Sequence, residues 1–198
     1  LGYIKRTPLA DFRSQARGGI GSKASASRDQ DFIEYVHQAS MHSTMMFFTE
    51  MGRLYWLKVY EIPEGNKQSK GRAIQNIINL QKGDKVRAFI NVKGLNDAEY
   101  VQNHYLIFAT KNGLMKKTTL EAYSRPRANG IIALSLREGD ELIGVRLTDG
   151  ESEMLIASYN GKVVRFPEDT VRPMGRRASG VRAIKLGEDS QERAVGMI

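Results

Sequence analysis

The sequence repeats a pattern of two glycines about every fifty residues. A first glycine, which follows an apolar segment, recurs at Gly2, Gly52, Gly113 and Gly161. A second glycine follows 17 or 19 residues later, at Gly19, Gly71, Gly130 and Gly180. A period of this size indicates stacked or radially arranged supersecondary units. We therefore predict one domain of four repeats, with approximate bounds 1–40, 41–98, 99–150 and 151–198.

Each repeat is predicted to contain about four short antiparallel strands joined by tight turns. Asn-Gly pairs at 112–113 and 160–161 tolerate the positive φ of a two-residue hairpin. The strands expected after the first glycines are 3–7, 53–59, 114–118 and 162–166. Further strands are expected at 77–80, 133–136 and 183–186, then at 86–92, 142–147 and from Ala194 onward, and residues 30–38 are interpreted as a strand.

Four-stranded units at this period favour an all-β, propeller-like disc over the alternative, a β-sandwich. The chain begins at Leu1 in the middle of a repeat and stops at Ile198 within a closing strand, so we expect a fragment that holds only part of the disc.

Basic residues gather between the two glycines of every repeat or directly after the second, in a chain whose net charge is +8. They are Arg13 and Arg17; Lys67, Lys70 and Arg72; Arg125 and Arg127; Arg172, Arg176 and Arg177. Cations at the same place in each repeat predict a basic belt along one edge, which is suited to the phosphates of duplex DNA rather than to base sequence. A docking surface for an acidic protein partner is the alternative from another class of function.

No catalytic or metal-binding residues are expected. The chain has no cysteine, which fits a reducing compartment, and no apolar run of membrane-spanning length, so no membrane partner is expected. His37, His42 and His104 lack partners at metal-ligand spacing, and Asp84, Asp140 and Asp189 stand in turns where aspartate caps backbone N–H groups.

Four segments, 2–8, 124–133, 141–150 and 171–176, resemble the family of C-terminal domains of bacterial DNA gyrase A subunits. The resemblance implies a β-pinwheel, a disc of four-stranded blades that exchange strands, of which about four would be present. It implies that the rim wraps duplex DNA in the cytoplasm. It also implies that the partners are the rest of the gyrase A subunit, together with the gyrase B subunit, in an A2B2 holoenzyme. That holoenzyme uses ATP and Mg, while this chain needs no cofactor.

The family has a box of glutamine, basic residues and glycines that distinguishes gyrase from topoisomerase IV. The matching residues are Gln15, Arg17, Gly18, Gly19 and Gly21. Ala16 and Ile20 replace two basic residues, so the homologous domain of the A-type chain of topoisomerase IV is the alternative within the family. Beyond the box, the predicted DNA-binding residues are Lys5, Arg6, Lys116, Lys117, Arg125, Arg127, Arg165, Arg172, Arg176, Arg177 and Arg182.

Overall fold

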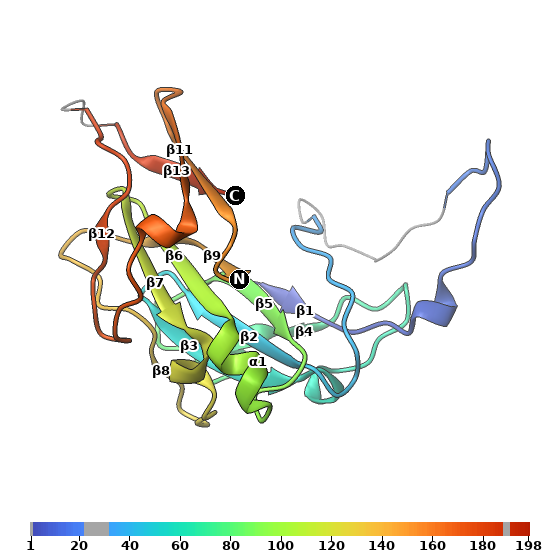
Figure 1. Cartoon of the computed structure of the whole chain (residues 1–198). Coiled ribbons are helices and arrows are strands. Elements are labelled where there is room, and N and C mark those ends of the chain that lie inside the picture. Colours follow the sequence, from blue (N-terminus) through green and yellow to red (C-terminus); the bar gives the residue numbers. More distant parts are fainter. Residues whose placement is uncertain (1, 22–31, 188–190) are drawn as a thin grey trace.

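The computed structural model describes residues 2–21, 32–187 and 191–198 (Figure 1). Within these residues the strands are β1 (Tyr3–Ile4), β2 (Thr44–Thr49), β3 (Arg53–Lys58), β4 (Arg72–Ala73), β5 (Val86–Val92), β6 (Tyr105–Thr110), β7 (Leu114–Thr119), β8 (Ile131–Ile132), β9 (Leu142–Thr148), β10 (Glu153–Ser158), β11 (Val163–Pro167), β12 (Val181–Arg182) and β13 (Ala194–Met197). The helices are α1 (Ala98–Asn103) and short 3-10 turns at Leu9–Asp11, Val59–Glu61, Ile74–Asn76, Leu120–Tyr123 and Glu168–Thr170. The expected all-β class is confirmed, and no helix of the described ranges could span a membrane.

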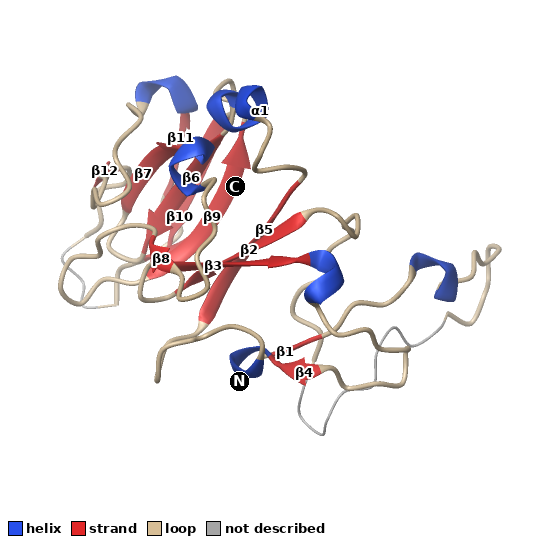
Figure 2. Ribbon diagram, turned by 90° about the horizontal axis from the view of Figure 1, so that it is seen from below, coloured by secondary structure: helices blue, strands red, loops and turns tan. Residues whose placement is uncertain are grey.

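Each four-stranded sheet combines three strands of one repeat with one strand of the next. The order β5-β2-β3-β8 places β8, from the third repeat, at the edge of the second repeat's sheet. The order β12-β7-β6-β9 places β12, from the fourth repeat, at the edge of the third. In the same way β1 pairs with β4, and the remaining sheet is β11-β10-β13. The named strands pair antiparallel throughout, and Figure 2 shows the two four-stranded sheets next to each other.

A glycine immediately precedes each donated strand because the backbones there are too close for a side chain. Gly71, Gly130 and Gly180 have φ values of +78°, +66° and +97°. A Cβ on Gly180 would lie 2.4 Å from the carbonyl oxygen of Met115, and one on Gly71 would lie 2.7 Å from that of Ile4. Only glycine combines positive φ with so close an approach of two chains. The second glycine of the sequence pattern therefore marks where one repeat joins its neighbour.

The main hydrophobic core lies between the sheets of the second and third repeats. The rings of Phe48 and Phe108 meet there edge to face, with centroids 5.4 Å apart. Strand β6 is buried on both faces, because Leu106 and Phe108 belong to this core while Ile107 packs in the core shared with the fourth repeat. This explains the continuous apolar run of β6, since a strand covered on both sides does not alternate in polarity.

Three of the expected strands are wrong in position. Residues 77–80, 133–136 and 183–186 are not strands, and the paired segments are the two-residue strands β4, β8 and β12 just before them. The N–H groups of Ala133 and Leu134 instead donate to the carbonyl of Gly52, at 2.8 and 3.3 Å, which caps the preceding hairpin turn. The chain leaves the sheet there because its hydrogen bonds go to a turn rather than to a ladder.

The strand expected at 30–38 is also absent from 32–38, while residues 30 and 31 lie outside the described residues. The corresponding strand of the second repeat, β5, pairs with β2, which directly precedes the turn at Gly52. Residues 32–38 form no such ladder with a described strand. Helix α1 was not expected, although Asp97 caps it by accepting a hydrogen bond from the Tyr100 N–H at 3.0 Å.

Candidate nucleic-acid interface

The loop between the two glycines carries the same tight turn in all four repeats. The turns cover 16–19, 66–69, 127–130 and 175–178, and in each the fourth residue donates its N–H to the carbonyl of the first, at 3.1, 3.1, 2.9 and 3.0 Å. We call these the tip turns. The loops that carry them continue from β3, β7 and β11 and, in the second to fourth repeats, run on into the donated strands. One sequence pattern therefore builds four equivalent protrusions.

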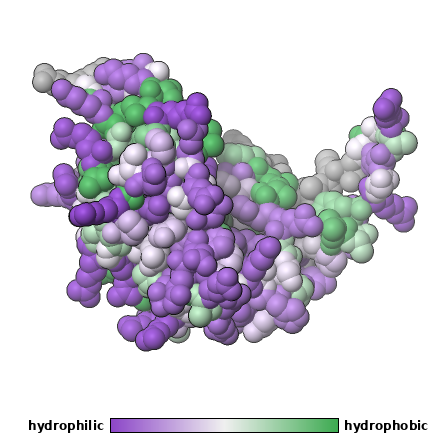
Figure 3. Space-filling model, viewed as in Figure 1, coloured by the Kyte–Doolittle hydropathy of each residue, from purple (hydrophilic) through white to green (hydrophobic). Residues whose placement is uncertain are grey.

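Every tip turn carries at least one cationic side chain. They are Arg17, Lys67, Arg127, Arg176 and Arg177. Arg17, Arg127 and Arg177 are exposed, and none of them takes part in the ion pairs found among the described residues. Their charges are therefore available to an anionic partner, and Figure 3 shows that hydrophilic side chains cover most of the face in view.

Further exposed arginines flank these turns. They are Arg125, Arg172 and Arg182. All three were predicted from the sequence, so the structure brings most of the proposed cations onto tip turns or the segments beside them. A guanidinium group suits phosphate because it offers several donors in a planar fork.

The first tip turn belongs to the glutamine- and glycine-rich box. Gln15 Oε1 accepts a hydrogen bond from the Gly21 N–H at 2.9 Å and so closes the loop around Arg17. Gly18 and Gly21 both have φ of +78°. Figure 1 shows this loop reaching away from the sheets, and residues 8–21 are exposed.

Gly21, rather than Gly19, is the true second glycine of the first repeat. Gly21 has positive φ and lies 19 residues after Gly2, which is the spacing of Gly71 from Gly52. Gly19 closes the tip turn, as Gly130 does, but it is not among the glycines with positive φ, so its assignment from spacing alone was wrong.

Lys116 was expected to be an exposed rim cation, and the structure shows that this is wrong. It is 1% exposed on β7, where Nζ donates to the carbonyls of Ala133 and Arg176, both at 2.6 Å, and to the Tyr123 hydroxyl at 3.3 Å. Burial, with a smaller contribution from the Arg176 guanidinium, lowers the pKa of Lys116 to about 7. Burial raises the pKa of Tyr123 well above its ordinary value, so its hydroxyl stays protonated and donates to Ala133 at 2.7 Å.

Lys117 is likewise buried, which corrects the same expectation. Its side chain is 5% exposed and its Nζ lies 3.0 Å from Glu168 Oε1, whose side chain is 0% exposed. The ammonium also lies 4.3 Å from the centre of the Tyr105 ring. This ion pair joins β7 of the third repeat to the 3-10 turn of the fourth, so it serves the junction between repeats.

Three other predicted cations are engaged by the protein itself. Lys5 Nζ donates to the carbonyls of Asn66 and Ser69, at 2.8 and 2.9 Å. Arg6 pairs with Glu64 at 2.5 Å, and Arg165, although exposed, pairs with Glu153. Sequence reasoning also missed Arg53, whose Nη2 donates to the carbonyl of Asn129 at 3.0 Å. Its position directly after a turn glycine was the available signal.

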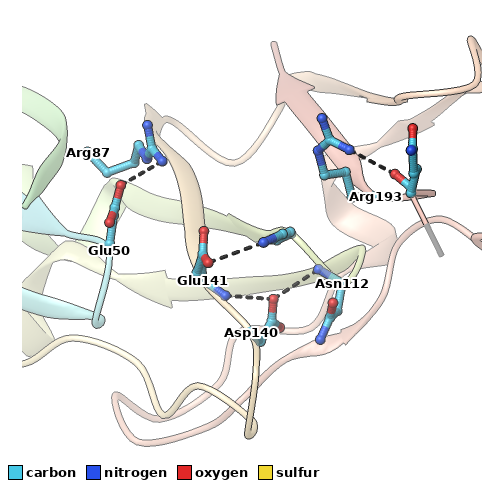
Figure 4. Close-up of polar contacts among 8 residues, drawn as sticks. Glu50, Arg87, Asn112, Asp140, Glu141 and Arg193 are labelled. Atoms are coloured by element: carbon cyan, nitrogen blue, oxygen red, sulfur yellow. Dashed lines mark hydrogen bonds and ion pairs between the residues drawn. The ribbon is translucent and has the colours of Figure 1, made fainter.

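The acidic residues of the Gly-Asp turns act within the fold (Figure 4). Asp140 Oδ1 accepts hydrogen bonds from the N–H groups of Asn112 and Glu141, both at 2.9 Å. Asp84 Oδ1 does the same for Lys85 at 2.8 Å, so the predicted capping is confirmed for Asp84 and Asp140. Asp189 lies outside the described residues. Among those that are described, no three His, Cys, Asp or Glu side chains form a group that could hold a metal ion.

The chain matches the family model described as "DNA gyrase C-terminal domain, beta-propeller" over residues 1–40, 43–93, 104–149 and 152–198. Helix α1 falls in the unmatched segment between the second and third of these ranges. The chain is 47% identical to the DNA gyrase A subunit of Haemophilus influenzae, over 93% of this chain and 20% of that protein. It is 43% identical to that of Staphylococcus aureus, over 96% of this chain and 21% of that protein. It therefore spans about a fifth of the length of these curated relatives.

Two solved structures share the fold. The crystal structure of the C-terminal domain of DNA topoisomerase IV matches with a TM-score of 0.80 and 28% identity, covering 99% of this chain and 57% of that one. The structure of a DNA gyrase A C-terminal domain matches with a TM-score of 0.74 and 23% identity, covering 99% and 61%. Together with the family model, these matches confirm the expected β-pinwheel class.

Proposed function

Because the chain belongs to the DNA gyrase C-terminal domain family, we propose that it binds and wraps duplex DNA within the gyrase holoenzyme. In this role it assembles with the rest of the gyrase A subunit, and with the gyrase B subunit, in an A2B2 complex of the bacterial cytoplasm. That holoenzyme, an ATP-dependent type II DNA topoisomerase, uses the wrapped segment to introduce negative supercoils. The chain supplies binding rather than catalysis.

The recurrence of a cation on every tip turn, exposed in three of the four, is the observation that carries the proposal. Arg17, Arg127 and Arg177 lie on the tip turns of three repeats, and none of them lies within ion-pair distance of a described carboxylate. Duplex DNA carries about one negative charge per 1.7 Å of axis, so such a series matches a backbone and not a base sequence. Bending 20–30 base pairs by 40–90° costs on the order of 1–6 kcal/mol, which several phosphate contacts offset.

The A-type chain of topoisomerase IV is the second candidate, because the solved domain of that enzyme matches with a TM-score of 0.80. The box favours gyrase. Gln15 closes the glycine loop through Gly21, and Arg17 stands within it, even though Ala16 and Ile20 carry no charge. The two candidates differ in the topology they impose: the gyrase assignment requires a shift in linking number when nicked circles are ligated in the presence of the chain.

Salt dependence tests the proposal directly. With about five phosphate contacts, log K for a fluorescent duplex should fall against log salt with a slope near −4.5. Arg127→Ala should weaken binding of every duplex sequence alike and reduce the steepness by about 0.9. Lys111→Ala is the matched control, because Lys111 lies in a hairpin turn and is already paired with Glu141 at 3.2 Å. A binding constant that barely changes between about 50 and 200 mM salt contradicts the proposal.

A further inference from the structure

One buried ammonium group connects the third repeat to the tip turn of the fourth. Lys116 Nζ lies 2.6 Å from the carbonyl oxygen of Arg176, the second residue of tip turn 175–178. The same group lies 2.6 Å from the carbonyl of Ala133, which follows the donated strand β8. Lys116 is therefore bonded at once to its own repeat and to the next.

At the two preceding junctions a cation of one repeat likewise donates to carbonyls of the next repeat's tip turn. Lys5, in the first repeat, donates to both end carbonyls of the second repeat's tip turn, those of Asn66 and Ser69, at 2.8 and 2.9 Å. Arg53, in the second repeat, donates to the carbonyl of Asn129 in the third repeat's tip turn at 3.0 Å. Each of the three cations stands one to three residues after a first glycine. A cation at this place therefore bonds the following repeat's tip turn at every junction described.

These bonds hold the turn in one orientation toward solvent. Lys116 Nζ donates to the carbonyl of Arg176 at 2.6 Å, so this carbonyl is held pointing at Lys116. The peptide group is planar and trans, so the N–H of Arg177 is turned the opposite way, outward. The exposed Arg177 side chain therefore follows directly on a peptide group that is held from the preceding repeat.

We propose that Lys5, Arg53 and Lys116 are positioning residues, each of which orders the tip turn of the following repeat so that its cations meet DNA phosphates. The inference rests on the proposed DNA-binding function. It assigns these three residues a different role from the exposed arginines: they act on DNA through the next repeat and do not contact it.

Limited digestion with trypsin tests the positioning without DNA. Lys116→Met should speed cleavage after Arg176 and Arg177, about three- to tenfold, because a turn with fewer hydrogen bonds opens more often. Cleavage after Arg127 should not change. Arg53→Met should speed cleavage after Arg127 and leave cleavage after Arg176 and Arg177 unchanged. Each variant is therefore the control for the other. Equal acceleration at both sites in either variant would mean general unfolding and would overturn the inference, as would no acceleration at all.

A double-mutant cycle tests the link to DNA. In the otherwise unchanged chain, Lys116→Met should weaken duplex binding about three- to tenfold. In a chain that already carries Arg176→Ala and Arg177→Ala, the same change should cost less than about twofold, because the groups it positions are gone. If Lys116→Met weakens duplex binding by the same factor in both chains, the positioning role is refuted. If the unchanged chain fails to bind duplex, the proposed function fails, while the digestion pattern still decides whether the turns are held from the preceding repeat.

Discussion

The buried ion pair between Lys117 and Glu168 should be costly to break from one side. The nitrogen and oxygen are 3.0 Å apart, and the side chains are 5% and 0% exposed. The Glu168 carboxylate also accepts hydrogen bonds from the Thr148 hydroxyl at 2.7 Å and from the Ser152 N–H at 3.2 Å. Lys117→Met removes the positive charge but leaves the carboxylate enclosed with two neutral donors.

The expected cost follows from this enclosure. Removing one partner of a buried pair costs about 3–5 kcal/mol, because an uncompensated charge remains in the interior. A domain is stable by only about 5–15 kcal/mol, so Lys117→Met should remove about a fifth of that stability or more. Adding Glu168→Gln removes the stranded charge while the amide oxygen still accepts from Thr148. The double variant should therefore lie within about 1–2 kcal/mol of the unchanged chain.

Equilibrium unfolding in urea measures this difference. The midpoint should fall strongly for Lys117→Met and recover in the double variant, with the slope m unchanged in both. DNA affinity of the double variant should remain within about twofold of the unchanged chain, because a buried ammonium releases no counterions from DNA. The reasoning fails if Lys117→Met costs less than about 1 kcal/mol or if Glu168→Gln gives no recovery. A loss of DNA affinity in the double variant would instead make Lys117 a phosphate contact.

Three further predictions concern the repeat junctions and the tip turns. Gly180→Ala should cost about 2–3 kcal/mol in urea unfolding, because its Cβ would lie 2.4 Å from a backbone oxygen, whereas Gly161→Ala, with positive φ but open space, should cost about 1–2. The pKa of Lys116 is about 7 in the folded chain and 10.5 when unperturbed, so the unfolded chain binds more protons between those values. The stability of the unchanged chain relative to Lys116→Met should therefore be flat below pH 7 and rise by up to about 1.4 kcal/mol per unit from pH 7 to 9; a flat series of urea midpoints would contradict this. Arg17→Glu should reduce the linking-number shift in ligated nicked circles more than Arg127→Ala does, and equal effects would exclude a special role for the glycine loop.

The elements built from local contacts were predictable from the sequence. The strands expected at 53–59 and 114–118 are β3 (Arg53–Lys58) and β7 (Leu114–Thr119), and 86–92 coincides with β5. Glycine turns and alternating apolar residues set these hairpins, and both signals lie within a few residues of the strands they specify. The glycine spacing likewise predicted the repeat, because the hairpin turns and the sites just before the donated strands both require positive φ.

Strand donation was not predictable in detail, because its determinants are far apart in the sequence. β8 and β12 contain two residues each and pair with strands about 70–80 residues earlier. Sequence patterns over a few residues cannot predict a pairing at this distance. The buried lysines were missed for a similar reason. Lysine is almost never fully buried unless it is paired. Two adjacent lysines, Lys116 and Lys117, near the end of a predicted strand therefore suggest solvent-exposed side chains when only the sequence is considered. Their partners, Arg176 and Glu168, come from the following repeat.

Strand donation and the three cations, Lys5, Arg53 and Lys116, act in the same direction along the chain, because both link a repeat to the one that follows it. The second, third and fourth tip turns each precede a strand that pairs with the previous repeat, and each is bonded by a cation of that previous repeat. The geometry of each of these loops is therefore set by the repeat before it, as in repeat arrays whose stability is a sum of nearest-neighbour terms. A disturbance on β7 should reach the loop at 175–178 and leave the loop at 127–130 intact. In the proposed DNA complex, the angle between adjacent blades would set the spacing of successive cations along the duplex, so the junctions rather than any single loop would determine the bending of the DNA.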